Sequence, residues 1–166
     1  MSINNLSELF TSDIQYLYNA EKQISMNLSK LADFASSDEV QKIIENHIEE
    51  NKEHLRRLEE IGETLGIKLE GKQSHGVEGI IKEADEIVKK QSIMDPYVMD
   101  AALIATAQRI QHYEIAAYGT LRTYADLLGY KEASEYLQKS LEEEKETDDK
   151  LTEVAVNLIN PQAKSR

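Results

Sequence analysis

Two acidic side chains stand in the apolar stripes of predicted helices, where a charge is costly. Glu21 lies between Leu17 and Ile24, and Glu114 follows Ile110 by four residues. At about 100° per residue, these spacings put each glutamate on the buried face of its helix. A carboxylate buried without compensation costs several kcal/mol, so it must be protonated, paired with a cation or bound to a metal.

Two further predicted helices direct polar side chains toward the same interior. On the first, His47, Asn51 and His54 face inward and Glu50 lies at the edge. On the second, the inward residues are Ser140, Glu144, Thr147 and Asp148, with Glu143 at the edge. His75 and His112 fall outside both faces and are assigned no role. The candidate metal ligands are therefore Glu21, His47, Glu50, His54, Glu114, Glu143, Glu144 and Asp148.

The heights of four of these acids provide an independent argument. Glu21 and Glu50 are 29 residues apart, and so are Glu114 and Glu143. Both midpoints fall on predicted turns between helices. Residues equidistant from a turn meet across an antiparallel pair, so each hairpin is predicted to bring a glutamate pair to one level.

Metal is the simplest neutraliser for such a set, because inward-facing Lys and Arg are scarce; Lys22 and Arg109 project sideways. Helical bundles of this kind bind two irons or manganeses through one Glu on each of two helices and Glu-x-x-His on each of the others. The oxygen-rich set and the absence of Cys favour iron or manganese, two ions per chain. A lone Glu or His on an apolar face is commonly a hydrogen-bonded core residue, and His54, one turn from Glu50, is a stronger candidate than His47.

The elements that must position these residues follow from apolar periodicity. Steps of three and four residues predict long helices from 4 to 34, from 40 to near 66, from 96 to 129 and from 130 to 160, with a short helix at 77–88. The fold class is thus an all-α, ferritin-like four-helix bundle of two antiparallel hairpins, joined by a long crossover that contains the short fifth helix. Residues 1–160 form a single domain, and Pro161 closes the last helix before a short polar tail at 161–166.

Composition narrows the classes of function. A chain of 166 residues, 40% apolar and 30% charged, suits one helical domain, and the lack of Cys suits a reducing compartment. Neither an export signal nor an apolar stretch of about 20 residues is present, so a cytoplasmic protein without a membrane partner is expected. The net charge of -12 repels nucleic acid and attracts cations, which favours metal or a basic partner.

Five motifs stand in order along the chain: Tyr18-Asn-Ala-Glu21-Lys-Gln, His47-Ile-Glu-Glu50, Asp100-Ala-Ala-Leu-Ile-Ala, His112-Tyr-Glu114-Ile-Ala-Ala-Tyr-Gly-Thr and Leu141-Glu-Glu-Glu-Lys-Glu-Thr-Asp148. Together they resemble the YciE/YciF-like family of ferritin-like bacterial proteins. The resemblance runs nearly end to end. It implies a ferritin-like bundle, a homodimer and a role in bacterial stress, and it points to Glu21, His47, Glu50, Glu114, Glu143, Glu144 and Asp148. The pattern departs from Glu-x-x-His, since Thr147 stands where the last helix would carry a His.

Three functions remain open at this stage. The first is a metal-dependent redox protein whose paired ions react with peroxide or oxygen. The second is a non-catalytic dimeric scaffold of the stress response, in which the buried acids are structural. The third, an iron-storage cage, is weaker because nothing in the sequence identifies a mineral-nucleating surface.

Overall fold

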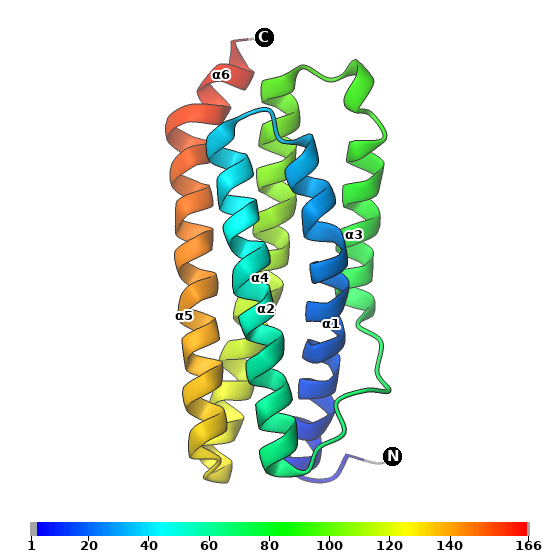
Figure 1. Cartoon of the computed structure of the whole chain (residues 1–166), viewed down its shortest axis with the longest axis vertical. Coiled ribbons are helices and arrows are strands. Elements are labelled where there is room, and N and C mark those ends of the chain that lie inside the picture. Colours follow the sequence, from blue (N-terminus) through cyan, green and yellow to red (C-terminus); the bar gives the residue numbers. More distant parts are fainter. Residues whose placement is uncertain (1–2, 166) are drawn as a thin grey trace.

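Four long antiparallel helices form a bundle, and a fifth, shorter helix lies along one side (Figure 1). The structure is a computed structural model that describes residues 3–165. The helices are α1 (Leu6–Phe34), α2 (Asp38–Leu65), α3 (His75–Val88), α4 (Pro96–Leu128) and α5 (Lys131–Val154). A 3₁₀ turn, Gln91–Ile93, precedes α4. The predicted fold class is confirmed, and no strand occurs within the described range.

The helix ends are set by local capping. Ser37 caps α2, and Asp95 caps α4 by accepting a hydrogen bond from Tyr97 N at 3.0 Å, with Pro96 in the first turn. Gly66 and Gly129 end α2 and α4 in the left-handed conformation, with φ of 66° and 73°. Both predicted hairpin turns are therefore present, at the predicted positions.

The long connection between α2 and α4 decides which helices are neighbours. It returns the chain to the opposite end of the bundle, and α3 packs against α1 and α4 as it passes (Figure 1). As a result α1 lies beside α4, and α2 lies beside α5. All four long helices can thus contribute side chains to one interior.

The chain does not leave the helical conformation at Pro161, contrary to prediction. Residues Ala155–Ile159 form a π-helical segment, and α6 (Asn160–Lys164) continues from it. Pro161 falls in the first turn of α6, where its missing N–H has no α-helical partner to lose. The expected polar tail at 161–166 is therefore helical through Lys164, and Arg166 lies outside the described residues, as do Met1 and Ser2.

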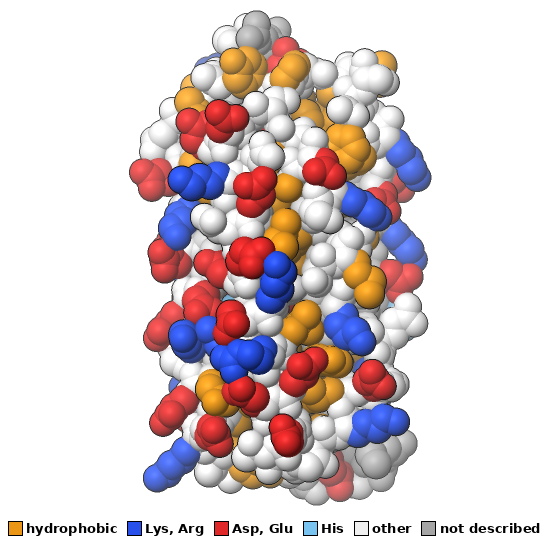
Figure 2. Space-filling view, in the orientation of Figure 1, with side chains coloured by type: hydrophobic (Ala, Val, Ile, Leu, Met, Phe, Trp, Pro, Cys, Tyr) orange, Lys and Arg blue, Asp and Glu red, His pale blue; other side chains and the backbone are white. Residues whose placement is uncertain are grey.

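Buried apolar side chains form two clusters rather than one continuous core. One cluster includes Ile24 and Leu28 in the second half of α1 and Leu103 near the start of α4. The other includes Phe10 and Ile14 in the first half of α1 and Leu137 near the start of α5. Figure 2 shows acidic and basic side chains interspersed over one face, with hydrophobic side chains in a narrow band between helices. Across the described part of the chain, the helices are too short or too polar to cross a membrane.

Candidate metal centre

A layer of polar side chains separates the two apolar clusters at mid-height of the bundle. All four long helices contribute to it, and every member is at most 2% exposed. We call this set the polar layer: Glu21 of α1, His47, Asn51 and His54 of α2, Glu114 of α4, and Glu144 of α5. Apolar packing above and below leaves the layer without access to bulk water.

The polar layer contains two groups of metal-binding side chains that share one carboxylate. In the Glu21 group, His54 Nδ1 lies 2.9 Å from Glu144 Oε1 and 3.9 Å from Glu21 Oε1. In the Glu114 group, His47 Nε2 lies 3.5 Å from Glu114 Oε2 and 3.6 Å from Glu144 Oε2. Within each group, the ligand atoms all lie within 4.8 Å of one another. Glu144 therefore presents one oxygen to each group, which is the geometry of a bridging carboxylate.

The electrostatics of the polar layer are those of acids neutralised by imidazoles. Burial and the neighbouring Glu144 and Glu21 carboxylates raise the pKa of Glu114 well above its usual value. Burial would also raise the pKa of Glu144, but His47 and His54 hold it down to about 2. Burial would lower the pKa of His54, but its contacts with Glu143 and Glu144 prevail and raise it to about 10. Without metal, protons on the imidazoles thus balance the carboxylates.

An ion pair outside the layer orients His54. Its Nε2 lies 2.9 Å from Glu143 Oε2, so this nitrogen carries the proton and donates it. Arg57 holds Glu143 in turn with bonds of 2.5 and 2.9 Å, and it also donates to Ser140 at 3.0 Å. With Nε2 engaged, Nδ1 is the atom turned toward Glu21 and Glu144, an arrangement typical of metal-binding histidines.

Gln111 plays the same part for His47. The amide satisfies both neighbours when its oxygen accepts from His47 Nδ1 at 2.9 Å and its nitrogen donates to Glu144. The opposite orientation would place the Gln111 amide oxygen against the Glu144 carboxylate, so that two acceptors would face each other. His47 Nε2 is then free to face Glu114 and Glu144.

Glu21 and Glu114, the two carboxylates that the groups do not share, differ in their hydrogen bonds. Glu21 Oε1 accepts from the Tyr118 hydroxyl at 2.5 Å, and Glu21 Oε2 accepts from Asn51 Nδ2 at 2.5 Å. The Tyr118 ring also packs edge-on against His54, with centroids 5.5 Å apart. Neither oxygen of Glu114 has a hydrogen-bond partner among residues 3–165.

Five of the eight predicted ligands come together in the polar layer, and three do not. Glu50 lies half-buried at the α2–α5 edge, where it accepts from Thr147 Oγ1 at 3.0 Å. Glu143 pairs with Arg57 and His54 outside the layer, as described above. Asp148 was expected to face inward, but it lies at the edge of α5, with the exposed His112 at 3.1 Å. The Asp148 side chain is 17% exposed, and the inward position of that turn belongs to Thr147, which is 3% exposed.

The predicted pairing of acids across each hairpin is wrong by one residue. The partner of Glu21 across the first hairpin is Asn51, not Glu50. In the second hairpin Glu114 shares the polar layer with Glu144, not with Glu143. The predicted helix faces, which put Asn51 and Glu144 inward and Glu50 and Glu143 at the edge, agree with the structure better than the pairing taken from the residue spacing.

Three residues of the site were missed, and Arg57 is the most important. The sequence indicated few inward-facing cations, yet Arg57 is 3% exposed and pairs with Glu143. Arg57 follows His54 by three residues, and residues three apart lie on the same face of a helix. This spacing could have predicted that Arg57 faces inward. Gln111 and Tyr118 each stand one turn from Glu114, which was also a usable signal.

Unpartnered buried atoms test whether the polar layer suits a metal. Within residues 3–165, no hydrogen bond reaches Asn51 Oδ1 or either oxygen of Glu114. His54 Nδ1 and Glu144 Oε1 face each other at 2.9 Å as an ion pair. Buried polar atoms without partners are rare and costly. The histidine nitrogens and carboxylate oxygens of the polar layer converge in two groups, so the residues present fit a pair of oxygen-preferring divalent ions.

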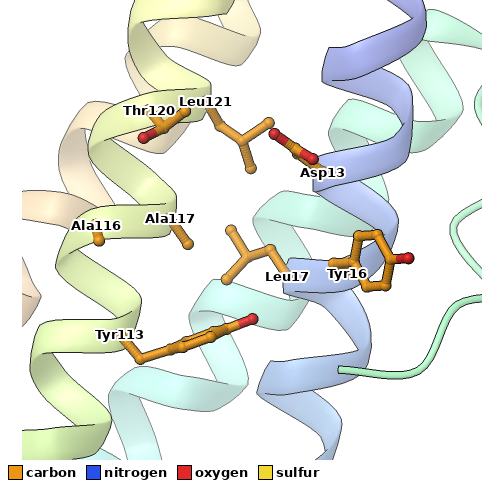
Figure 3. Close-up of a pocket in the computed structure, with 8 residues that line it drawn as sticks. All are labelled: Asp13, Tyr16, Leu17, Tyr113, Ala116, Ala117, Thr120 and Leu121. Atoms are coloured by element: carbon orange, nitrogen blue, oxygen red, sulfur yellow. The ribbon is translucent and has the colours of Figure 1, made fainter. Parts of the chain in front are cut away.

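A separate groove of about 360 Å³ lies between α1 and α4 (Figure 3). Leu17 and Ala117 form part of its apolar wall, and Asp13, Tyr16 and Tyr113 add polar atoms. None of the side chains of the polar layer lines it. The Tyr113 hydroxyl lies 2.8 Å from Ser74 Oγ in the crossover, although the next residue, Glu114, points into the bundle. The groove and the polar layer are thus distinct features.

The bundle and its polar layer together define a ferritin-like protein with a carboxylate–histidine centre. Residues 5–164 match the model of DUF892, a domain of unknown function, and the chain belongs to this family. It is 38% identical to Protein YciF of Escherichia coli K12 over 167 aligned positions, covering 100% of this chain and 99% of that protein. The family resemblance drawn from the motifs is confirmed.

Solved structures agree with this assignment. The crystal structure of the E. coli stress protein YciF superimposes with a TM-score of 0.89 at 39% identity, covering 95% of this chain and 99% of that one. YcfI of Rhodopseudomonas palustris, described as a putative structural protein, gives a TM-score of 0.85 at 36% identity, covering 91% and 95%. A Xanthomonas campestris protein at 18% identity shares the fold, with a TM-score of 0.76 and coverage of 97% and 98%.

Proposed function

We propose that this chain binds two divalent iron or manganese ions in the polar layer and protects the bacterial cell under stress. The observation that carries the proposal is the position of Glu144 between two groups, each of which adds one His and one further Glu. The stress role is taken from the related E. coli protein, which is described as a stress protein. A pair of such ions would supply redox chemistry toward peroxide or oxygen.

The chain's own residues have definable tasks in this function. His47, Glu114 and Glu144 would hold one ion, and Glu21, His54 and Glu144 the other. The ion pair of Glu143 with Arg57 fixes the ring of His54, and Gln111 fixes that of His47. The two apolar clusters keep bulk water away from the centre, which strengthens every electrostatic contact inside it.

The scaffold function remains the alternative, and one observation favours it. Part of the polar layer is compensated without metal, because Glu21 accepts from Tyr118 and Asn51, and Glu144 pairs with His54 at 2.9 Å. The Rhodopseudomonas relative is described as a putative structural protein. In either function we infer a cytoplasmic homodimer, and the mass in solution separates this state from an iron-storage cage.

Metal content after anaerobic reconstitution tests the proposal. We expect chelator-treated protein, reloaded with ferrous iron or Mn²⁺, to retain about two ions per chain. Glu144→Gln should lose most of both ions, because Glu144 serves both positions. The matched control is Glu146→Gln on the same helix, where the side chain is 69% exposed. A wild-type protein that binds no metal, and that Glu144→Gln makes more stable, would instead support the scaffold.

A further inference from the structure

The two metal positions of the proposed centre are alike in composition but not in surroundings. Each has one histidine and one glutamate of its own, and they share Glu144. Both oxygens of Glu21 already accept short hydrogen bonds, whereas neither oxygen of Glu114 accepts any from the described residues. A difference in affinity must therefore arise from the groups around the ligands.

We propose that the two positions fill in order, with the Glu114 group binding the tighter ion and the Glu21 group the weaker, and that Asn51 and Tyr118 set this difference. The inference rests on the proposed metal-binding function. Donors on both oxygens of Glu21 stabilise the free carboxylate and withdraw charge from it. An ion at this position must compete with two charge-assisted hydrogen bonds.

At the Glu114 group, a metal ion has no hydrogen bond to the carboxylate to compete with in the described part of the chain. The Glu114 carboxylate is 0% exposed and accepts no hydrogen bond from the described residues. Its charged neighbour His47 lies at 3.5 Å, so a bound ion would supply a closer partner than the imidazole does. A buried polar group without a partner carries a desolvation penalty that ion binding removes. This favours binding at the Glu114 group before binding at the Glu21 group.

The histidines do not offset this difference. Glu143 makes His54 a stronger donor to metal, but the bidentate contact with Arg57 already balances the charge of Glu143. His47 is oriented by the neutral amide of Gln111. Neither histidine therefore receives a large net negative charge from the groups that orient it, and the two should bind metal about equally well.

Asn51 occupies the position that makes this centre asymmetric. It stands three residues before His54, where bundles with Glu-x-x-His carry the glutamate. The corresponding position in the second hairpin, three residues before Thr147, is Glu144. The Asn51 amide nitrogen is bound to Glu21, and its Oδ1 is buried without a partner. One hairpin thus contributes the bridging carboxylate, and the other contributes a neutral clamp on Glu21.

Titration of metal-free protein with Mn²⁺ tests the order, with free Mn²⁺ measured by electron paramagnetic resonance and heat by calorimetry. We expect two steps whose dissociation constants differ by about 10- to 100-fold, the size by which changes in the groups around metal ligands alter affinity. Glu114→Gln should abolish the tight step, and Glu21→Gln should abolish only the weak one. Two equal steps, or loss of the tight step in Glu21→Gln, would overturn the proposal. No binding at all would instead overturn the proposed function.

Removing the donors tests their part in the difference. Tyr118→Phe deletes one hydroxyl, and Asn51→Asp replaces the clamp by a carboxylate; each should tighten the weak step several-fold and leave the tight step unchanged. Tyr124→Phe on the same helix, which touches no ligand, is the matched control. An unchanged or weakened second step in both variants would show that these residues do not set the order.

Discussion

At the scale of single residues, Arg57 is the support on which the orientation of His54 depends. It is 3% exposed, and Glu143, its partner, has a side chain that is 25% exposed. A buried ion pair contributes little net stability as a pair, but loss of one partner leaves the other charge uncompensated. Arg57 therefore combines a structural role with an indirect role at the centre.

We expect Arg57→Met to lower the free energy of unfolding by about 3 kcal/mol, measured by urea denaturation of metal-free protein. The methionine fills most of the space but removes the Arg57 donor from Ser140 and leaves Glu143 with His54 as its remaining charged partner. Arg56→Met is the control, because the Arg56 side chain is 50% exposed and should change stability by at most about 0.5 kcal/mol. Equal effects of the two substitutions would contradict the role assigned to Arg57.

At the scale of elements, the first hairpin turn is tied to the beginning of α4. Asp100 is fully buried, and its two oxygens accept from the backbone N–H groups of Ser36 at 2.7 Å and Ser37 at 2.9 Å. These N–H donors belong to the turn between α1 and α2, and Asp100 of α4 provides their acceptors. The aspartate thus sets the height of the first hairpin against the second, and with it the level of the polar layer.

Asp100→Ala should destabilise the protein by about 3 kcal/mol, because it leaves two backbone donors without their charged acceptor. Thermal unfolding followed by circular dichroism measures the loss. Asp149→Ala, at an exposed position of α5, is the matched control and should leave the melting temperature nearly unchanged. If Asp100→Ala and Asp149→Ala had the same melting temperature, contacts other than those of Asp100 would have to hold the turn.

At the scale of the whole molecule, the polar layer divides the core and makes stability depend on pH. Folding raises the pKa of His54 from the ordinary 6.5 to about 10, so its contribution is fully present below pH 6.5 and is lost as the pH rises toward 10. Folding lowers the pKa of Glu143 and Glu144 from 4.5 to about 2, so their contributions are present above pH 4.5 and are lost as the pH falls toward 2.

Metal-free protein should therefore be less stable at pH 9 than at pH 6.5, with a slope of up to about 1.4 kcal/mol per pH unit for each proton held only by the folded state. His54→Asn should flatten this slope. His75→Asn is the control, since the His75 side chain is 79% exposed in the crossover. Urea denaturation at a series of pH values provides the measurement, and equal slopes in the two variants would contradict the assignment to His54.

Much of the fold follows from the sequence because helix periodicity, capping residues and turn glycines act locally. The stripes of α1 and α4 indicated that Glu21 and Glu114 are buried, and Ser37, Asp95, Gly66 and Gly129 marked helix ends that the structure contains. The π-helical segment at 155–159 was not predictable in this way. The segment contacts α4, a tertiary contact that the local pattern around Pro161 does not contain.

The helix faces already indicated the members of the polar layer, with Asn51 and Glu144 inward and Glu50 and Glu143 at the edge. Only the tertiary structure decided which of these side chains contact one another, because adjacent residues on a helix differ by about 100° and a modest rotation about the axis changes which of them meets a given partner. That rotation is set by packing between helices, which no single stripe contains. Side-chain length also matters, because Arg57 reaches Glu143 from a neighbouring helix. The sequence by itself determined the helices, their ends and the level of the acids, whereas packing selected which carboxylates face each other.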